Sequence, residues 1–201
     1  MRTSLKDLST FLLAGAAIAA MPAQANVNLV MVRHAEKPAA GLGQLSCQGL
    51  NRALALPGVL IPAYGKPAAI YAPNPGVPKD DEGTPFNYVR PLATIEPTAI
   101  RLGLPVNTTW AWNDIADLQA ELLAPAHEGQ TLYVAWEHHE LEQLARAILK
   151  KRGGDPSTVP TWRSSDFDTI YVLTLQTSGG AALKVEKEGL DGKSSSCPGT
   201  Q

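Results

Sequence analysis

The sequence predicts an α/β fold, a three-layer α/β/α sandwich built around a mostly parallel central sheet. Short apolar runs, typical of buried strands, alternate along the chain with segments whose apolar residues recur at helical spacing. Strands and helices that alternate in this way form a parallel sheet with helices on both faces. We expect one domain over residues 26–190, which is long enough to bury a sizeable core, and a flexible Gly/Ser-rich tail over 191–201.

The strands are predicted from five apolar segments. The run at 28–32 is nearly continuous, which suits a strand buried on both faces, and similar runs follow at 68–72 and 131–136. Two further segments, 169–175 and 182–186, are separated by Ser-Gly-Gly. This last pair predicts a hairpin added to the sheet.

The helices are predicted from start and stop signals. Ser46 offers an N-cap for a helix that runs toward Pro57, and Gly103 closes a helix that follows Arg90. Further helices are expected over 114–123 and after Trp136. The stretch from Gly76 to Tyr88 is rich in proline and acidic residues, and we expect a mobile loop there.

Residues 1–25 have the pattern of a secretory signal. Arg2 and Lys6 precede an apolar run over 11–21, and small residues end the segment at Ala25. The run is shorter than the roughly 20 residues of a membrane span. We expect cleavage after Ala25 and a periplasmic or secreted protein without a membrane span. The alternatives are an uncleaved anchor or a first helix of the domain.

Charge and cysteines limit the possible partners. The net charge is −2 and no run of basic residues occurs, so a nucleic-acid partner is not expected. Cys47 and Cys197 are an even pair that an oxidising compartment can join as a disulfide, and two unpaired thiols are the alternative. The sequence does not indicate an oligomeric state.

Two of the predicted strands run directly into histidines. Arg33 and His34 follow the first strand, and His138 follows the third at the start of a helix. Reactive groups of parallel sheets gather beyond the carboxyl ends of the strands, and a helix N-terminus favours anions. The sequence therefore predicts a pocket for an oxyanion at this edge.

These segments resemble the histidine phosphatase superfamily, which includes phosphoglycerate mutases and phosphohistidine phosphatases. Val32–Lys37 resembles its strand-end RHG or RHA motif, and Arg90–Ala99 resembles the helix of its second arginine. Leu45–Leu50, Val134–His138 and Phe167–Tyr171 resemble the first helix, the strand before the second histidine and the final strand. The resemblances occur in family order along nearly all of the predicted domain.

The chain departs from the family pattern at three places. Ala35 replaces the commoner glycine, Ile95 follows Thr94 where the family has alanine, and Trp136-Glu137 precede the second histidine. These changes bear on the choice of substrate more than on the chemistry.

The resemblance implies a phosphoglycerate mutase-like fold and a metal-independent phosphatase without a cofactor. His34 would attack the phosphate of a small molecule or a protein side chain and form a phosphohistidine. Arg33 and Arg90 would clamp the phosphate oxygens, because planar guanidinium groups match two oxygens at once. His138 would stabilise the developing charge.

The proton donor to the leaving group is the least defined role. Asp114 is the first choice, and Asp117, Glu140, Glu36 and Glu137 are alternatives. The residues expected to bind substrate are Glu36, Lys37, Asn74, Thr94, Glu137 and His139. The residues considered as walls of an open pocket are Tyr88, Trp110, Trp112 and Trp136.

Other functions remain open at this stage. A phosphate-binding protein with the same fold and weak catalysis is the main alternative. A mutase needs a phosphorylated sugar acid that an exported protein rarely meets. A metallohydrolase built on His138, His139 and Glu140 lacks the usual spacing of metal ligands.

Overall fold

The computed structural model describes residues 26–199, and a six-stranded mixed sheet forms their centre. In spatial order its strands are β5 (Val106–Asn107), β2 (Ala69–Tyr71), β6 (Thr131–Trp136), β1 (Val27–Arg33), β7 (Thr169–Leu175) and β8 (Ala181–Lys187). The first four are parallel to one another, and β7 and β8 add an antiparallel hairpin beside β1. The predicted fold class is confirmed. The predicted signal segment lies outside the described residues.

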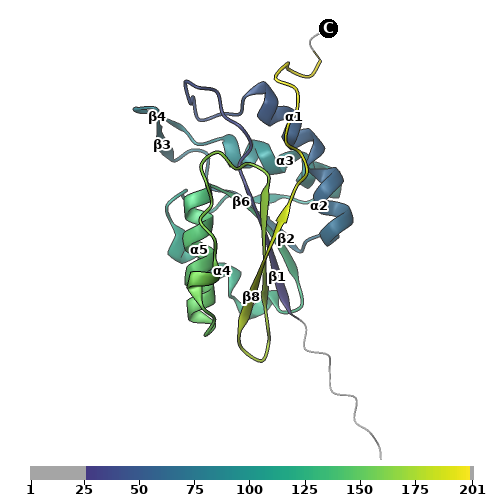
Figure 1. Cartoon of the computed structure of the whole chain (residues 1–201), viewed down its shortest axis with the longest axis vertical. Coiled ribbons are helices and arrows are strands. Elements are labelled where there is room, and N and C mark those ends of the chain that lie inside the picture. Colours follow the sequence, from purple (N-terminus) through teal and green to yellow (C-terminus); the bar gives the residue numbers. More distant parts are fainter. Residues whose placement is uncertain (1–25, 200–201) are drawn as a thin grey trace, which may run out of the picture.

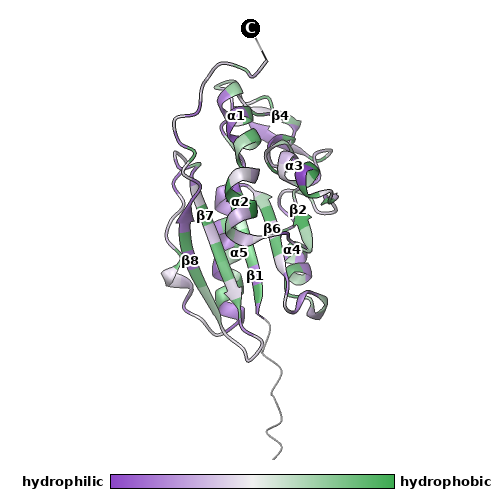
Figure 2. Cartoon of the chain, turned by 90° about the vertical axis from the view of Figure 1, so that its right-hand side faces the viewer, coloured by the Kyte–Doolittle hydropathy of each residue, from purple (hydrophilic) through white to green (hydrophobic). Residues whose placement is uncertain are grey.

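Helices cover both faces of the sheet (Figures 1 and 2). They are α1 (Cys47–Ala55), α2 (Pro57–Tyr64), α3 (Arg90–Leu102), α4 (Ile115–Leu122) and α5 (His138–Lys151), with short 3-10 turns at Pro125–His127 and Pro156–Thr158. None of the helices within residues 26–199 has the length and apolar character needed to cross a membrane.

The core explains the continuous apolar run of β1. Leu29 and Met31 belong to a buried cluster with α4 and α5, whereas Val30 and Val32 belong to a second cluster with α2 and α3. Successive side chains of a strand point to opposite faces of the sheet, so a strand covered on both sides needs apolar residues at every position.

Two helices follow His34 where the sequence predicts one. The Ser46 side chain accepts a hydrogen bond from the Gly49 amide and caps α1, as predicted. The prediction ended this helix at Pro57, but α2 begins there. Proline suits a first helical position because the amide hydrogen that it lacks would have no partner there.

The mobile loop predicted between Gly76 and Tyr88 is wrong. The chain forms a separate antiparallel ribbon there, β3 (Pro78–Asp81) and β4 (Thr84–Asn87), which projects beside the sheet edge (Figure 1). Both strands of a two-stranded ribbon are edges, so each tolerates a proline that a central strand would not. Three hydrogen-bond donors from other segments hold the Asp81 carboxylate and fasten the ribbon to the domain.

The C-terminal segment lies along α1. A disulfide joins Cys47 to Cys197, and the Asn51 side chain donates to the carbonyls of Ser194 and Ser196 at 2.9 and 2.8 Å. The contacts of the domain thus extend beyond residue 190, where the prediction placed its boundary. The flexibility of this tail stays a prediction.

Strand register brings the predicted site residues to one edge. Arg33, the last residue of β1, pairs with Trp136, the last residue of β6, and the His34 amide donates to the Trp136 carbonyl at 2.9 Å. Because β7 is antiparallel to β1, the segment that leads into Thr169 reaches the same edge. Segments far apart in the sequence therefore meet beyond the end of β1.

Candidate active site

A cavity of about 400 Å³ lies at the carboxyl edge of the parallel strands. The predicted site residues that line it are Arg33, His34, Lys37, Arg90, Glu137 and His138. A larger cavity of about 670 Å³ borders Val27, Pro125 and Lys151, and no predicted site residue lines it.

His34 is buried and has a defined proton position. Its Nδ1 lies 2.8 Å from the Ala35 carbonyl oxygen, which can only accept, so Nδ1 carries the proton and Nε2 keeps its lone pair. Burial lowers the pKa of His34 to about 3, and the positive charges of Arg90 and Arg33 act in the same direction. The ring is therefore neutral across the physiological range.

Arg33 is bound by the segment that precedes β7. Its Nη1 donates to the carbonyls of Ser164 and Asp166 at 2.7 and 2.9 Å, and its guanidinium carbon lies 3.8 Å from the centre of the Phe167 ring. Burial lowers the pKa of Arg33 to about 10, which still leaves it charged at neutral pH.

Arg90, the first residue of α3, is held by the β3–β4 ribbon. Its Nη1 forms an ion pair with Asp81, which also accepts from Lys37 at 2.7 Å and from the Gly43 amide at 3.1 Å. Burial would raise the pKa of the Asp81 carboxyl, but the hydrogen bonds from Lys37 and Arg90 outweigh it and hold the pKa below its usual range. An ionised carboxylate thus contacts an arginine predicted to bind phosphate.

Glu137 and His138 form the start of α5. The Glu137 carboxylate accepts the amides of His139 and Glu140 at 2.8 and 3.2 Å as an N-cap, and it forms an ion pair with His138 Nδ1. Burial would raise the pKa of Glu137, but its hydrogen bond to His138 lowers it to about 2. Glu137, His138 and His139 also place one potential metal ligand each within 4.8 Å of one another.

Apart from His138 Nδ1, which is paired with Glu137, three buried nitrogen atoms of residues that line the cavity have no hydrogen-bond partner among the described residues. They are Arg33 Nε, Arg90 Nε and His138 Nε2. A buried polar group without a partner costs about 1–3 kcal/mol, so such groups are rare unless something else binds them. Their convergence on one cavity from two strand ends and α3 defines a site suited to an oxyanion.

The structure does not bring five predicted site residues into the cavity lining. The Glu36 carboxylate is held by Arg52, and Asn74 Oδ1 accepts the Gly76 amide at 2.9 Å. Thr94 is buried, where its hydroxyl accepts the Ala35 amide and donates to the Arg90 carbonyl. Thr94 therefore acts on the site through the backbone of its neighbours.

The other two lie further out. His139 is exposed, and the centre of its ring lies 4.1 Å from the centre of the His138 ring. Asp114 is exposed before α4, where its carboxylate accepts the Ala111 amide at 2.9 Å. The aromatic residues considered as walls do not line the cavity either, although the Tyr88 ring lies edge-on to His34 at 6.1 Å between centres.

Several lining residues were missed by sequence reasoning. They are Lys79, Asp80, Asp81, Glu82, Ser164 and Phe167. The acidic cluster at 80–82 stands out in the sequence, but no local pattern shows that Asp81 pairs with Arg90, nine residues away, and with Lys37, 44 residues away. Backbone carbonyls such as that of Ser164 leave no residue pattern that could identify them.

Comparison with solved structures identifies the fold as phosphoglycerate mutase-like. A mycobacterial glucosyl-3-phosphoglycerate phosphatase with inorganic phosphate superposes with a TM-score of 0.56 at 19% identity, over 82% of this chain and 97% of that one. A phosphoglycerate mutase from Plasmodium falciparum gives 0.54 at 12% identity, over 79% and 89%. A phosphoserine phosphatase mutant from Entamoeba histolytica gives 0.52 at 12% identity, over 82% and 98%.

These neighbours are histidine phosphatase superfamily proteins, and the likeness at such low identity concerns the fold alone. A search of protein-family models found no match. A search of curated proteins also found none.

The first prediction concerns the protonation of His34. Because the pKa is lowered to about 3, we expect the ring to stay in its neutral Nδ1–H form from pH 8 to pH 5. Nitrogen NMR shifts of the ring measure this, with His34→Ala identifying the signals. A titration near 6.5 would contradict it.

The same lowered pKa makes the stability of the fold depend on pH. The unfolded chain takes up the His34 proton below pH 6.5 and the folded chain does not, so this residue lowers the free energy of unfolding as the pH falls from 6.5 toward 3.

The second prediction concerns Asp81. Replacing its charge in Asp81→Asn removes the anion that competes for Arg90, so we expect orthophosphate to bind on the order of tenfold more tightly. Titration calorimetry measures the change. Asp155→Asn is the matched control, since it removes one carboxylate outside the cavity, where the Asp155 side chain bonds only to Ser157 among the described residues. Weaker binding in Asp81→Asn alone would show that the carboxylate holds Arg90 in place for phosphate.

Proposed function

We propose that this protein is a metal-independent phosphatase of the histidine phosphatase superfamily that hydrolyses a phosphomonoester or a phosphohistidine. The observation that carries the proposal is the set of partnerless buried nitrogens on Arg33, Arg90 and His138 around a neutral, buried His34. The family resemblance in the sequence and the phosphoglycerate mutase-like fold support the same conclusion.

The proposed reaction has two steps. His34 Nε2 attacks phosphorus, a P–N bond forms, and the bond to the leaving group breaks with its electron pair. Water then attacks the phosphohistidine, which releases orthophosphate and returns the lone pair to Nε2. Guanidinium groups of Arg33 and Arg90 and the His138 ring would stabilise the charge on the transferring oxygens in both steps.

The carboxyl groups at the cavity limit the choice of leaving group. The pKa values of Glu137 and Asp81 are lowered by hydrogen bonds, from His138 to Glu137 and from Lys37 and Arg90 to Asp81, so neither carboxyl group carries a proton at neutral pH. Asp114 is exposed and outside the lining. We therefore favour substrates whose leaving group departs without a proton from these residues, such as an aryl phosphate or a phosphoramidate.

Phosphate release from an aryl phosphate in the presence of EDTA tests the proposal. We expect activity that survives the chelator and falls by more than about 1,000-fold in His34→Ala, because the nucleophile is lost. His127→Ala is the matched control, since His127 bonds to Glu121 and Gln130 outside the cavity and should leave the rate unchanged.

Two other outcomes would contradict the proposal. Loss of activity with EDTA would favour a metal ion at Glu137, His138 and His139. Tight binding of orthophosphate without turnover of any phosphate ester would favour the alternative of a phosphate-binding protein.

We also propose that the protein is exported and works in the periplasm or outside the cell. The signal pattern of residues 1–25 supports this, and so does the disulfide between Cys47 and Cys197, because disulfides persist in oxidising compartments. N-terminal sequencing of protein from a bacterial host should find Asn26 as the first residue, in the periplasm or the medium. Full-length protein in the cytoplasm would contradict export.

A further inference from the structure

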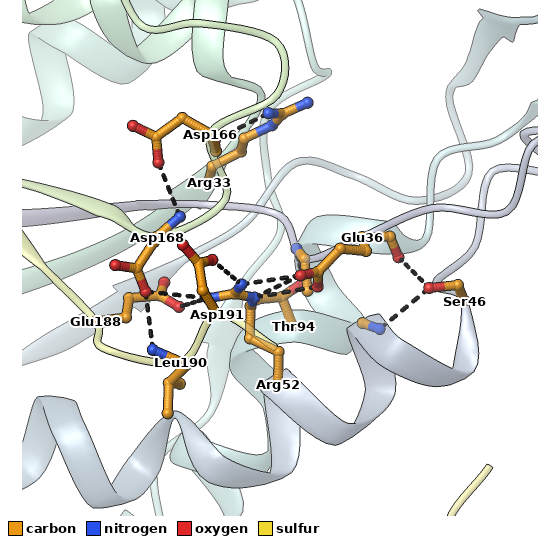
Figure 3. Close-up of polar contacts among 12 residues, drawn as sticks. Arg33, Glu36, Ser46, Arg52, Thr94, Asp166, Asp168, Glu188, Leu190 and Asp191 are labelled. Carbon is orange, nitrogen blue, oxygen red and sulfur yellow. Dashed lines mark hydrogen bonds and ion pairs between the residues drawn. The ribbon is translucent and has the colours of Figure 1, made fainter. Parts of the chain in front are cut away.

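Arg52 of α1 lies at the centre of a cluster of carboxylates (Figure 3). Only 1% of its surface is exposed. Its Nε and Nη2 donate to Glu36 at 2.9–3.0 Å, and its Nη2 also donates to Asp191 at 2.8 Å. Its Nη1 donates to Glu188 at 2.7 Å and to Asp168 at 3.4 Å. One guanidinium thus joins the loop after β1, the start of β7, the segment after β8 and the tail.

Acidic groups outnumber the cation in this cluster, because four carboxyl groups surround the single Arg52 guanidinium. Burial raises the pKa of Glu188 to about 8, in spite of the opposing effect of Arg52. Glu188 Oε1 has no hydrogen-bond partner among the described residues. We therefore assign the proton to Glu188 at neutral pH. Glu36 is the carboxyl group that Arg52 contacts through two nitrogens, Nε and Nη2.

The first connection from this cluster leads to His34. Glu36 lies two residues after His34, and its carbonyl accepts both the amide and the hydroxyl of Ser46 at 2.9 and 3.2 Å. A side chain at Gly49 would meet the same carbonyl at 2.2 Å, so α1 packs directly on this backbone. Arg52 and the start of α1 together hold the loop that carries the nucleophile.

The second connection leads to Arg33. Asp168 lies two residues after Asp166, and its amide donates to the Asp166 side chain at 2.9 Å. The Asp166 carbonyl accepts Arg33 Nη1 at 2.9 Å (Figure 3). The Asp168 carboxylate that contacts Arg52 also accepts the Leu190 amide at 2.8 Å. The segment that holds Arg33 is therefore fixed to the same guanidinium.

We propose that Arg52 is a positioning residue for the phosphatase reaction, which sets His34 through Glu36 and Arg33 through Asp168. The inference rests on the proposed function, because it assigns Arg52 no contact with substrate. Supporting groups of this kind matter because a misplacement of about 1 Å at reacting atoms can lower a rate about 100-fold.

Three variants test this role with an aryl phosphate. In Arg52→Lys one ammonium cannot replace the fork on Glu36, and in Glu36→Gln the charge that anchors the loop is lost. We expect kcat/KM to fall about 30- to 100-fold in both. Glu188→Gln resembles the protonated Glu188 and contacts the same guanidinium, so it should stay within about twofold of the parent protein.

Thermal stability separates positioning from a general loss of folding. Each assay runs well below the Tm of the variant, beside Leu149→Ala, which destabilises the core of α5 on the other face of the sheet. We expect Leu149→Ala to keep nearly full activity at a similar loss of Tm. Activity of Arg52→Lys and Glu36→Gln within twofold of the parent, or a loss that merely follows Tm across all four variants, would overturn the inference.

Hydrogen exchange gives a readout that does not require turnover. The Ala35 amide is bonded to Thr94 and the His34 amide to Trp136 in the native state. We expect both to exchange at least about tenfold faster in Arg52→Lys and Glu36→Gln but not in Glu188→Gln. If the parent protein releases no phosphate, the proposed function fails while this measurement still decides the positioning. Unchanged exchange in an active protein would overturn the positioning alone.

Discussion

The burial of three guanidinium groups at one edge of the sheet is the constraint on which the rest of this structure depends. Arg33, Arg52 and Arg90 are each no more than 5% exposed. A buried charge without partners costs several kcal/mol, so each arginine requires oxygen atoms at fixed positions. These oxygen atoms come in part from segments outside the central sheet. The 164–168 loop binds Arg33, the β3–β4 ribbon binds Arg90, and the C-terminal tail contributes to the binding of Arg52.

The three arginines differ in how far their partners neutralise the positive charge. Arg52 is surrounded by carboxyl groups, and all of its nitrogens are used. Arg33 is held mainly by neutral carbonyls and an aromatic ring, so its positive charge is not neutralised by a direct ion pair among the described residues. Arg90 is intermediate, because Asp81 contacts one end of it and its Nε has no partner. The unneutralised charge lies beside His34, where it adds to the effect of burial in keeping the imidazole neutral and favours an incoming anion.

The candidate site is held by the main sheet and its helices on one side and bordered by a separate element on the other. The backbone of the His34 loop is held by hydrogen bonds to β6, to the Thr94 hydroxyl of α3 and to Ser46, the N-cap of α1. The side of Arg90 and Lys37 is closed by a two-stranded ribbon that pairs with no strand of the main sheet. The ribbon and the His34 loop are thus held by separate sets of contacts.

The sequence by itself determined five of the six strands of the main sheet, most of the helices and the residues at the two strand ends, because apolar periodicity and N-caps are local signals. The two-residue strand β5 is too short to leave such a pattern. It also indicated Arg33, His34, Arg90 and His138, which the structure brings around one cavity. Only the tertiary structure decided the partners of the charged residues. Glu36 lies beside His34 in the sequence yet is bound by Arg52, and the acids at 80–82 form a ribbon over the site. Ion pairs between distant segments depend on where the fold places them, and no local pattern records that.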